Sequence, residues 1–335
     1  MITLQDDCLV FQFPEVHADA GARIEFQRTL RIPDDERDYP LPPGLGAFPL
    51  RHLDDFASAL PGAWRKRGGI IMPMHQSEAL WLNFLGDYPC AIRIATGKID
   101  AVTGKDWSRG LRTKKQNYIV VPDQPWLDGY AVEEGVIRQF VAMPLGAGYT
   151  AEEQLTGAAE HGGIQIEVFP MKAEHYERVR AAMKDHMDEE VMYASMPMVS
   201  AAAEAPDMGL APGGWMHQEI FADVHGIDAW DLEHSSRCFV SLANSLTWAA
   251  ITDEVPPTKP PSAADYAAAG LPWFDYYGGD RNALAGAKKL KKLKSVKELG
   301  AIKGEQPLPE NQSVEPGPVI QLTPDGNAVV REGEF

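Results

Sequence analysis

The sequence lacks several features that would assign it to a broad class. It has only three cysteines among 335 residues, and they lie far apart, so it offers no disulfide framework and fits a reducing compartment. No stretch approaches the roughly 18 apolar residues of a membrane-spanning helix. The start, MITLQDDCLVF, lacks the basic end and apolar core of a signal peptide. We therefore expect a cytoplasmic protein without a transmembrane segment.

The sequence also lacks an excess of positive charge. Its formal net charge is -17, whereas general nucleic-acid binding requires basic surface that neutralises phosphates. The charge therefore argues against general nucleic-acid binding, and it does not bear on the fold. Hydrophobic residues make up 44% and charged residues 24% of the chain, as in ordinary globular proteins with a sizeable core.

Recognised catalytic motifs are missing as well. The chain contains no Gly-x-Ser-x-Gly, so nucleophilic catalysis has no support from a recognised motif. The segment TGKIDAVTGKDW lacks the spacing of a phosphate-binding loop and has Asp106 where serine or threonine is required. It indicates a β-hairpin, in which Thr96-Gly97-Lys98 turns one strand back on the next.

What the sequence does contain is a long series of strand patterns. Apolar or alternating runs of strand length follow one another with short connections, among them CLVFQF, GGIIMPM, CAIRIATG and GGIQIEVFP. Because helices do not separate most of these runs, the strands are expected to pair antiparallel. The sequence therefore predicts an α+β protein with a predominantly antiparallel β-sheet.

The chain is expected to have three parts. Residues 1–254 form a β-rich core with a helical excursion at 171–195, where apolar residues recur on one helical face. Residues 255–300 comprise a proline connector, an aromatic segment and a lysine-rich helix, and residues 301–335 form a mobile tail. The apolar face of the helical excursion consists of Tyr176, Val179, Met183, Met187 and Val191.

A weak internal repeat divides the β-rich core. Segments at about residues 65–95 and 137–168 share a strand, a Met-Pro pair, an intervening segment and an Ile-x-Ile strand. The Met-Pro pairs are 71 residues apart and the Ile-x-Ile strands 72. A duplication would give two related sheet units, arranged as a sandwich or barrel.

The stretch MPLGAGYTAEEQLTG, residues 143–157, places two glycines before the start of a helix. A phosphate cradle has this form, but it normally adds a basic residue or a metal that balances the charge of the ligand. Here Thr150 and Glu153 have the spacing of a capping box, which satisfies the same N–H groups from within the chain. The stretch therefore favours a capped turn, and we assign no phosphate-binding residue.

Metal ligation is the best catalytic hypothesis that the residues offer, although no motif indicates a cofactor. Met-His-Gln occurs twice, in MHQSE and MHQEI. On a strand, His217 and Glu219 would point to one face. With His75 from another strand they would supply the three ligands of a catalytic zinc site. The spacing matches no recognised metal motif, so hydrogen-bonded histidines at sheet ends are the favoured interpretation.

Two C-terminal segments are typical of interaction sites. LPWFDYYGG, residues 271–279, would either dock on its own domain, which we favour, or anchor a partner. KKLKKLKSVK, residues 288–297, has six lysines in ten residues and could contact an anionic membrane, a nucleic acid, the protein's own acidic surface or a neighbouring subunit. The candidate partner-binding residues are Trp273, Phe274, Tyr276, Tyr277, Lys288, Lys289, Lys291 and Lys292.

Five longer segments are distinctive. They are RTLRIPDD, QPWLDGY, IRQFVAMPLGAGYTAEEQLTG, MHQEIFADVHGIDAWD and GLPWFDYY. Together they resemble an uncharacterised family of bacterial and filamentous-fungal proteins over about residues 23–300. The resemblance implies no activity, cofactor or catalytic residue.

These observations favour a non-enzymatic binding or assembly protein that uses residues 271–297 to contact itself or another protein. A metal-dependent, hydrolase-like enzyme with histidine and glutamate ligands is one alternative. Capture of a small ligand between β-sheets is another.

Overall fold

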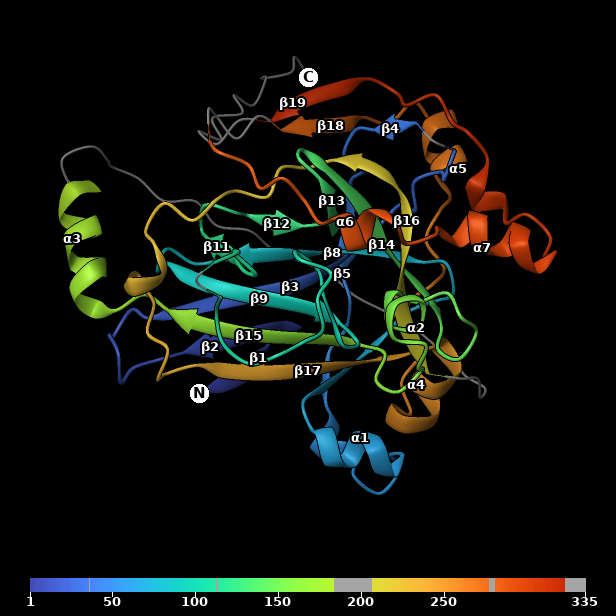
Figure 1. Ribbon diagram of the computed structural model, residues 1–335. Coiled ribbons are helices and arrows are strands. Elements are labelled where there is room, and N and C mark those ends of the chain that lie inside the picture. The colour runs from blue at the N-terminus through green and yellow to red at the C-terminus, as the bar shows by residue number, and fades with distance from the viewer. Residues whose placement is uncertain (36, 113, 184–206, 277–280, 323–335) are drawn as a thin grey trace, which may run out of the picture.

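Figure 1 shows the computed structural model, which describes residues 1–35, 37–112, 114–183, 207–276 and 281–322. Strands account for 36% and helices for 20% of the structure. Most strands belong to one large, mostly antiparallel sheet, and a small parallel sheet lies apart from it. The predicted α+β class with predominantly antiparallel sheet is therefore confirmed.

Within the described residues, the large sheet has seventeen strands and the small one has two. The large sheet contains β1 (Ile2–Gln5), β2 (Cys8–Gln12), β3 (Gly21–Thr29), β4 (Asp38–Tyr39), β5 (Gly44–Ala47), β6 (Arg51–His52), β7 (Ile70–Pro73), β8 (Ala79–Leu85), β9 (Cys90–Thr96), β10 (Ile99–Asp100), β11 (Ile119–Val121), β12 (Trp126–Leu127), β13 (Gly129–Glu133), β14 (Val136–Pro144), β15 (Ile164–Pro170), β16 (Met208–His217) and β17 (Ser236–Ala243). The small sheet pairs β18 (Trp273–Tyr276) with β19 (Val319–Leu322) in parallel.

The longer strands form one continuous hydrogen-bonded series, in the order β1, β2, β3, β8, β14, β16, β17, β15 and β9. Every neighbouring pair in this series is antiparallel. Parallel pairs occur where short strands join from the side, as β4 does on β16 and β7 on β17. The predicted hairpin at Thr96-Gly97-Lys98 is confirmed, because Thr96 of β9 pairs with Ile99 of β10.

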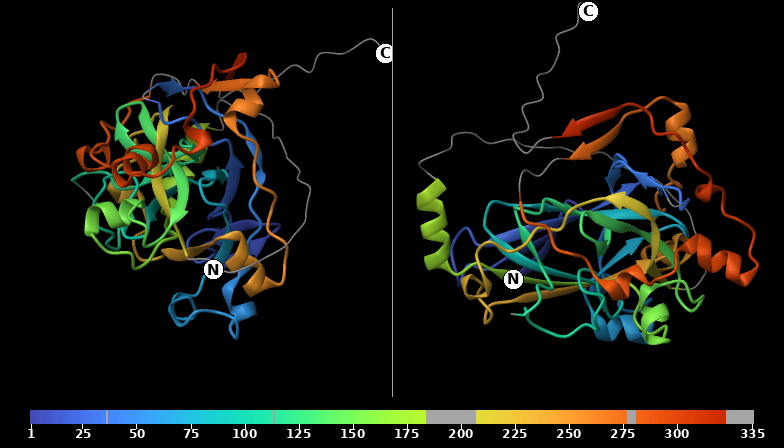
Figure 2. Two further views of the ribbon diagram at one scale, coloured as in Figure 1. Left: turned by 90° about the vertical axis from the view of Figure 1, so that its right-hand side faces the viewer. Right: turned by 45° about the horizontal axis from the view of Figure 1, so that its top comes forward.

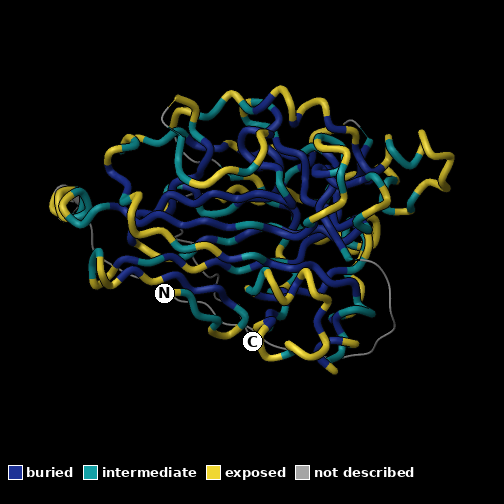
Figure 3. Tube along the Cα trace, turned by 60° about the horizontal axis from the view of Figure 1, so that its bottom comes forward, coloured by how far each residue is buried: buried dark blue, intermediate teal, exposed yellow. Residues whose placement is uncertain are grey.

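The strands enclose a large hydrophobic core that draws residues from both ends of the series. In β3, Ala22, Ile24 and Phe26 are buried while the residues between them are more exposed, which is the alternation of a half-buried strand. In β9 every residue is buried. Figure 3 shows buried residues along the central strands and exposed ones in the surrounding helices and loops. Full burial of one large apolar side chain contributes roughly 1.5–3 kcal/mol.

Short helices lie around the rim of the sheet (Figure 2). The capping box predicted at Thr150 and Glu153 is present, and Ser262 and Asp265 form a second one. The helices are η1 (Leu53–Phe56), α1 (Gly62–Arg67), α2 (Ala151–Thr156), α3 (Ala173–Met183), η2 (Ile227–Ala229), α4 (Ser245–Thr252), α5 (Ala263–Ala268), α6 (Lys288–Lys291), α7 (Val296–Lys303) and η3 (Pro309–Asn311).

The helical excursion predicted at residues 171–195 begins as expected. Helix α3 contains Tyr176 and Val179, and both pack against the core. Met187 and Val191 lie outside the described residues.

The two segments of the suggested repeat differ in their middle parts. Strand β8 follows the Met-Pro pair in the first segment, whereas helix α2 follows it in the second. Their last strands, β9 and β15, pair directly with each other. The duplication therefore stays a prediction.

The C-terminal part of the chain packs on the strands that precede it. Trp273 belongs to the main hydrophobic core. Farther along, the Arg31 guanidinium donates to Asn311 Oδ1 at 2.5 Å, and Arg37 pairs with Glu315 at 2.8 Å. Asn311 and Glu315 are thus bonded to the N-terminal part of the chain, and the mobility expected of residues 301–335 stays a prediction.

Candidate functional site

The structure does not bring the three candidate metal ligands together. His217 pairs with Val136 at the start of β14, and a Cβ placed at Gly135 would lie 3.8 Å from His217 Nε2 and 4.0 Å from Glu219 Cγ. His75 lies beyond the other end of β14, about 20 Å away at 3.3 Å per residue. Within the described ranges, no group of three His, Cys, Asp or Glu residues is placed to hold a metal ion.

His75 instead makes the contacts of a histidine at a sheet end. Its Nε2 lies 2.7 Å from the Pro257 carbonyl oxygen and its Nδ1 lies 3.3 Å from Ser245 Oγ. Its backbone N–H donates to Glu78 at 2.8 Å. These bonds occupy both ring nitrogens, so the residue acts here in packing the connection to β8.

The aromatic segment docks on its own domain. Trp273 is buried, with its ring near those of Tyr39 and Tyr266. The Phe274 backbone exchanges hydrogen bonds with Leu41 at 2.7 and 2.9 Å. Tyr276 lies edge-on to Trp126, with ring centroids 4.6 Å apart. Tyr277 lies outside the described residues.

The lysine segment has two distinct sides. Lys288, Lys289, Lys291 and Lys292 are exposed, whereas Leu290 between them is fully buried. The segment therefore anchors on the core through its apolar side and presents its charges outward.

The glycine turn before α2 holds a negative group that belongs to the chain itself. Glu153 Oε1 accepts hydrogen bonds from Gly146 N at 2.9 Å and Gly148 N at 2.7 Å, and its Oε2 accepts from Thr150 N at 3.1 Å. The Glu153 carboxylate thus occupies the place that a bound phosphate would take.

A pocket of about 280 Å³ lies over β15 and β17, beside the β9–β10 turn. These strands run side by side in Figure 1. Among the described residues, the lining has four basic residues, three aromatic or apolar residues, a glutamine and a cysteine, and no carboxylate. The lining residues are Arg67, Lys98, Trp107, His161, Gln165, Ile166, Arg237, Cys238 and Phe239.

Backbone carbonyls fix Arg67 at one end of this pocket. Its guanidinium donates to the carbonyl oxygens of His161 at 2.8 Å and Glu160 at 3.1 Å, and Cζ lies 5.0 Å from the centre of the Phe239 ring. Neither bond neutralises the guanidinium, because both acceptors are uncharged carbonyls. Arg67 therefore keeps its full positive charge in a held orientation.

A buried carboxylate orients His161. Glu152 Oε1 lies 3.0 Å from His161 Nδ1, and Glu152 Oε2 accepts from Gly162 N at 2.9 Å. A Cβ at Gly97 would lie only 2.3 Å from Glu152 Oε2, so this turn requires a glycine, whose φ is also positive at 53°. Among the described residues, His161 Nε2 has no hydrogen-bond partner, which leaves it for a ligand.

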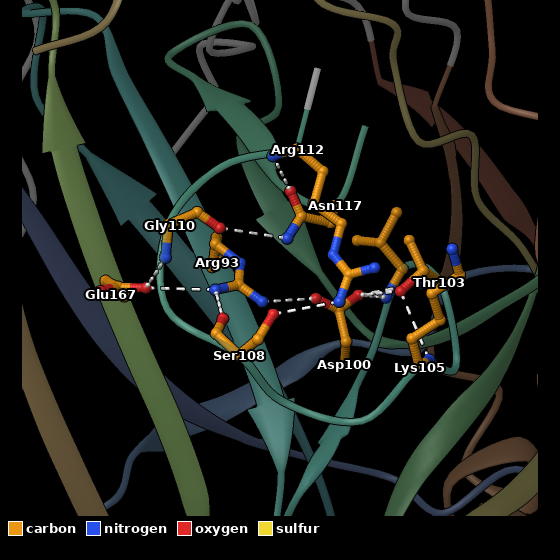
Figure 4. A network of polar contacts seen from close by, with 10 residues as sticks. Arg93, Asp100, Thr103, Lys105, Ser108, Gly110, Arg112, Asn117 and Glu167 are labelled. Carbon is orange, nitrogen blue, oxygen red and sulfur yellow. Dashed lines mark hydrogen bonds and ion pairs between the residues drawn. The ribbon is translucent and has the colours of Figure 1, made fainter. Parts of the chain in front are cut away.

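A buried ion network supports the wall that carries Trp107. Arg93 lies between Asp100 at 3.1 Å and Glu167 at 3.2 Å, and it also donates to the carbonyl oxygen of Ser108. Figure 4 shows this arrangement, with the loop through Ser108 passing beside the guanidinium. Arg93 Cζ lies 4.1 Å from the centre of the Trp107 ring. The network thus fixes the loop that closes one side of the pocket.

The same network keeps its carboxylates out of the pocket. Asp100 Oδ1 accepts from the N–H groups of Val102 and Thr103 at 3.2 and 2.9 Å. Burial raises the pKa of Asp100 above its ordinary value, although Arg93 and these donors oppose the shift. Glu167 also accepts from Gly110 N at 3.3 Å. Both carboxyl groups are therefore engaged behind the wall.

Two cations of the pocket are left without a counter-charge. In the described part of the chain, no carboxylate lies within ion-pair distance of Lys98 or Arg237. Arg237 lies opposite Glu167 in the strand register, but Arg93 and Gly110 already bind that carboxylate. The pocket therefore offers positive charge that the protein itself does not neutralise.

Cys238 lines the pocket without being a reactive thiol. Burial raises the pKa of its sulfur to about 12, so the thiol stays protonated at neutral pH. The pocket thus has charged and hydrogen-bonding groups for holding a ligand, and its cysteine is not a thiolate nucleophile.

The sequence gives almost no sign of this pocket. Its basic residues come from the end of α1, the β9–β10 turn, the connection before β15, and β17. Only the hairpin turn at Lys98 had a local signal, and nothing in the sequence indicated that β9, β15 and β17 are neighbours.

The chain matches no protein-family model, no curated protein and no solved structure. The resemblance to an uncharacterised family therefore stays a prediction. Among the residues that the structure describes, no helix has the length and apolar composition needed to cross a membrane.

Proposed function

We propose that the protein binds a small organic anion, bearing a phosphate or carboxylate group, in the basic pocket. One observation carries the proposal: Arg67, Lys98 and Arg237 line a single pocket, and no Asp or Glu of the described ranges belongs to its lining. In a chain of net charge -17, carboxylates outnumber cations, so a site without them is where an anion meets the least repulsion.

The lining chemistry supports this ligand class. Guanidinium groups form paired hydrogen bonds with phosphate and carboxylate oxygens, and a lysine adds a mobile point charge. Trp107 and Phe239 supply ring surface for an apolar part, and the Gln165 side chain adds hydrogen-bonding capacity. At about 280 Å³, the pocket is slightly smaller than typical ligand sites, which span roughly 300–1,000 Å³, so it suits a small ligand.

Small-ligand binding is one of the alternatives that the sequence offers, but the site proposed for it is a different one. The ligand lies on one face of β15 and β17, not between two sheets. The aromatic part of residues 271–297 packs on the domain, with Trp273 fully buried. A partner that needs Trp273 as an exposed anchor is therefore not favoured.

A thermal-shift screen tests the proposal. Inorganic phosphate, phenyl phosphate, benzoate and citrate would be added to the wild type, to Arg237→Ala and to Lys66→Ala, whose exposed lysine lies on α1 outside the pocket. A ligand at 100 times its Kd stabilises the folded state by about 2.7 kcal/mol. We expect a rise in Tm for the wild type and Lys66→Ala that is lost in Arg237→Ala. An equal response in all three proteins, or none in any, contradicts the proposal.

A further inference from the structure

A second basic surface is assembled from two segments that are distant in the sequence. Gly104 lies against α6, where a Cβ would meet Leu290 Cγ at 2.8 Å and Lys289 Cβ at 3.0 Å. Lys115 Nζ donates to the Gly286 carbonyl oxygen at 3.4 Å. Residues 103–112 and 114–117 therefore form one continuous surface with residues 286–297, which we call the basic surface.

The basic surface concentrates charge to a degree unlike the rest of the chain. Its two segments contain eleven lysines and arginines and a single acidic residue, Asp106. Ten of the eleven are exposed and Arg112 is partly exposed. The eleven are Lys105, Arg109, Arg112, Lys114, Lys115, Lys288, Lys289, Lys291, Lys292, Lys294 and Lys297.

Few of these charges are neutralised. Lys289 lies 3.9 Å from Asp106, and Lys291 pairs with Glu133. In the described ranges, the other members of the basic surface have no carboxylate within ion-pair distance. The surface thus keeps a strong local positive charge, although the whole chain is acidic.

In segment 286–297, the large apolar residues all face the core. Leu290, Leu293 and Val296 are 0, 4 and 2% exposed. Protein interfaces are built around buried apolar or aromatic anchors, and single-stranded nucleic acids are held by base stacking on aromatic rings. Segment 286–297 exposes neither kind of group. Its outward chemistry is that of hydrated lysine charges alone.

Adsorption to an anionic lipid surface needs only such charges. Clusters of 4–8 lysines or arginines bind anionic headgroups, at about 1 kcal/mol per basic residue near the membrane surface. A bilayer also contacts only one face of the protein, and salt screens charges beyond roughly 8 Å. The acidic remainder would therefore orient the molecule without preventing contact.

We propose that the basic surface binds anionic phospholipid headgroups and holds the protein peripherally on an anionic bilayer. The proposal is independent of the pocket. The main contacts would come from Lys288, Lys292 and Lys294, which are exposed and have no described carboxylate partner.

Vesicle co-sedimentation tests the proposal. The wild type would be mixed with vesicles of phosphatidylcholine alone and with vesicles that also contain phosphatidylserine. The test variant combines Lys288→Glu, Lys292→Glu and Lys294→Glu. Its matched control reverses three charges elsewhere, with Lys66→Glu, Lys172→Glu and Arg178→Glu. Thermal melts of both variants would establish that they fold.

We expect the wild type and the control to bind only the phosphatidylserine vesicles, less tightly as salt increases. The test variant should lose at least about 100-fold in affinity, given the worth of each basic residue. Arg237→Glu should bind vesicles normally, which separates this result from the pocket. Absence of wild-type binding at low salt, or equal binding by test variant and control, overturns the proposal. So does charge-dependent binding of a single-stranded oligonucleotide without vesicle binding.

Discussion

The glycine turn before α2 and the basic pocket both offer donors to a negative group, but they differ in where that group comes from. In the turn, the Glu153 carboxylate accepts from Gly146 N and Gly148 N. In the pocket, Lys98 and Arg237 line a space with no carboxylate. The first site is filled by the chain, and the second is left for a ligand.

This difference shows that the position of the nearest carboxylate is a better indicator of anion binding than a sequence motif. The turn looks more like an anion site in the sequence, because two glycines precede a helix start. The pocket has no such motif, yet two of its nearby acidic groups, Glu152 and Glu167, are bound behind its lining. The third, Glu160, is exposed and lies 3.9 Å from His161 Nδ1. An acidic group that is already bound within the protein does not compete with a ligand for the cations of the pocket.

Removal of Arg93 is expected to have the largest effect on stability and on the pocket. Arg93→Ala leaves Asp100 and Glu167 buried without their cation, which typically costs 3–5 kcal/mol. The loop that carries Trp107 would lose its support, and Glu167 would become free to pair with Arg237. We expect a large fall in stability by urea denaturation, and loss of anion binding at temperatures where the variant still folds.

Lys105→Ala is the control for Arg93→Ala, because Lys105 is exposed on the same loop. It should change stability by less than about 0.5 kcal/mol. A similarly small change in Arg93→Ala would show that the network does not support the wall.

Asp128 differs from the carboxylates that Arg93 binds, because its carboxyl group is buried and no cation of the described residues pairs with it. It accepts from Gln218 Nε2 at 2.8 Å, and burial raises its pKa to about 7. The folded state thus retains a proton that the unfolded state releases near its ordinary pKa of about 3.9. The resulting stability is fully present below about pH 4 and is lost as pH rises to about 7, at up to about 1.4 kcal/mol per pH unit.

Asp128→Asn should remove this dependence, because an amide does not titrate. Urea denaturation of the wild type and the variant between about pH 4 and 8 measures the two slopes across the window set by these pKa values. Equal slopes would mean that Asp128 is ionised in the folded protein throughout this range.

Glu153→Ala removes the internal anion of the glycine turn and has a smaller expected effect. The backbone N–H groups of Gly146, Gly148 and Thr150 would lose a charged acceptor. Since the turn is partly exposed, water can replace some of these bonds, and we expect a loss of about 2 kcal/mol. Glu152→Gln and Glu160→Ala are not suitable controls, because the two carboxylates lie 3.0 and 3.9 Å from the pocket histidine. Glu134→Ala changes an exposed glutamate in another turn and is suitable. If both changes cost the same, Glu153 does not hold the turn.

Local features of the fold could be predicted from the sequence because they depend on neighbouring residues. The hairpin at Lys98 and the caps at Thr150 and Ser262 follow from the turn and helix-start chemistry of a few positions. The antiparallel character follows from short connections between strand patterns. These features require no knowledge of which distant strands meet.

The pocket and the aromatic segment could not be settled in the same way. Arg67 and Arg237 are 170 positions apart in the sequence, and they meet only because β7 and β15 both pair with β17. Likewise, composition shows that Trp273 is apolar but not that the core has room for it. Long-range pairing decides both outcomes.

The most direct test of anion binding is isothermal titration of phenyl phosphate into the wild type and Arg237→Glu. The substitution places a carboxylate in the pocket and so imitates the filled glycine turn. The account predicts saturable one-to-one binding by the wild type that weakens with salt. It predicts a loss of roughly 10- to 100-fold in Arg237→Glu, as for a charged hydrogen bond of about 1.5–3 kcal/mol. Equal affinity in the two proteins would contradict it.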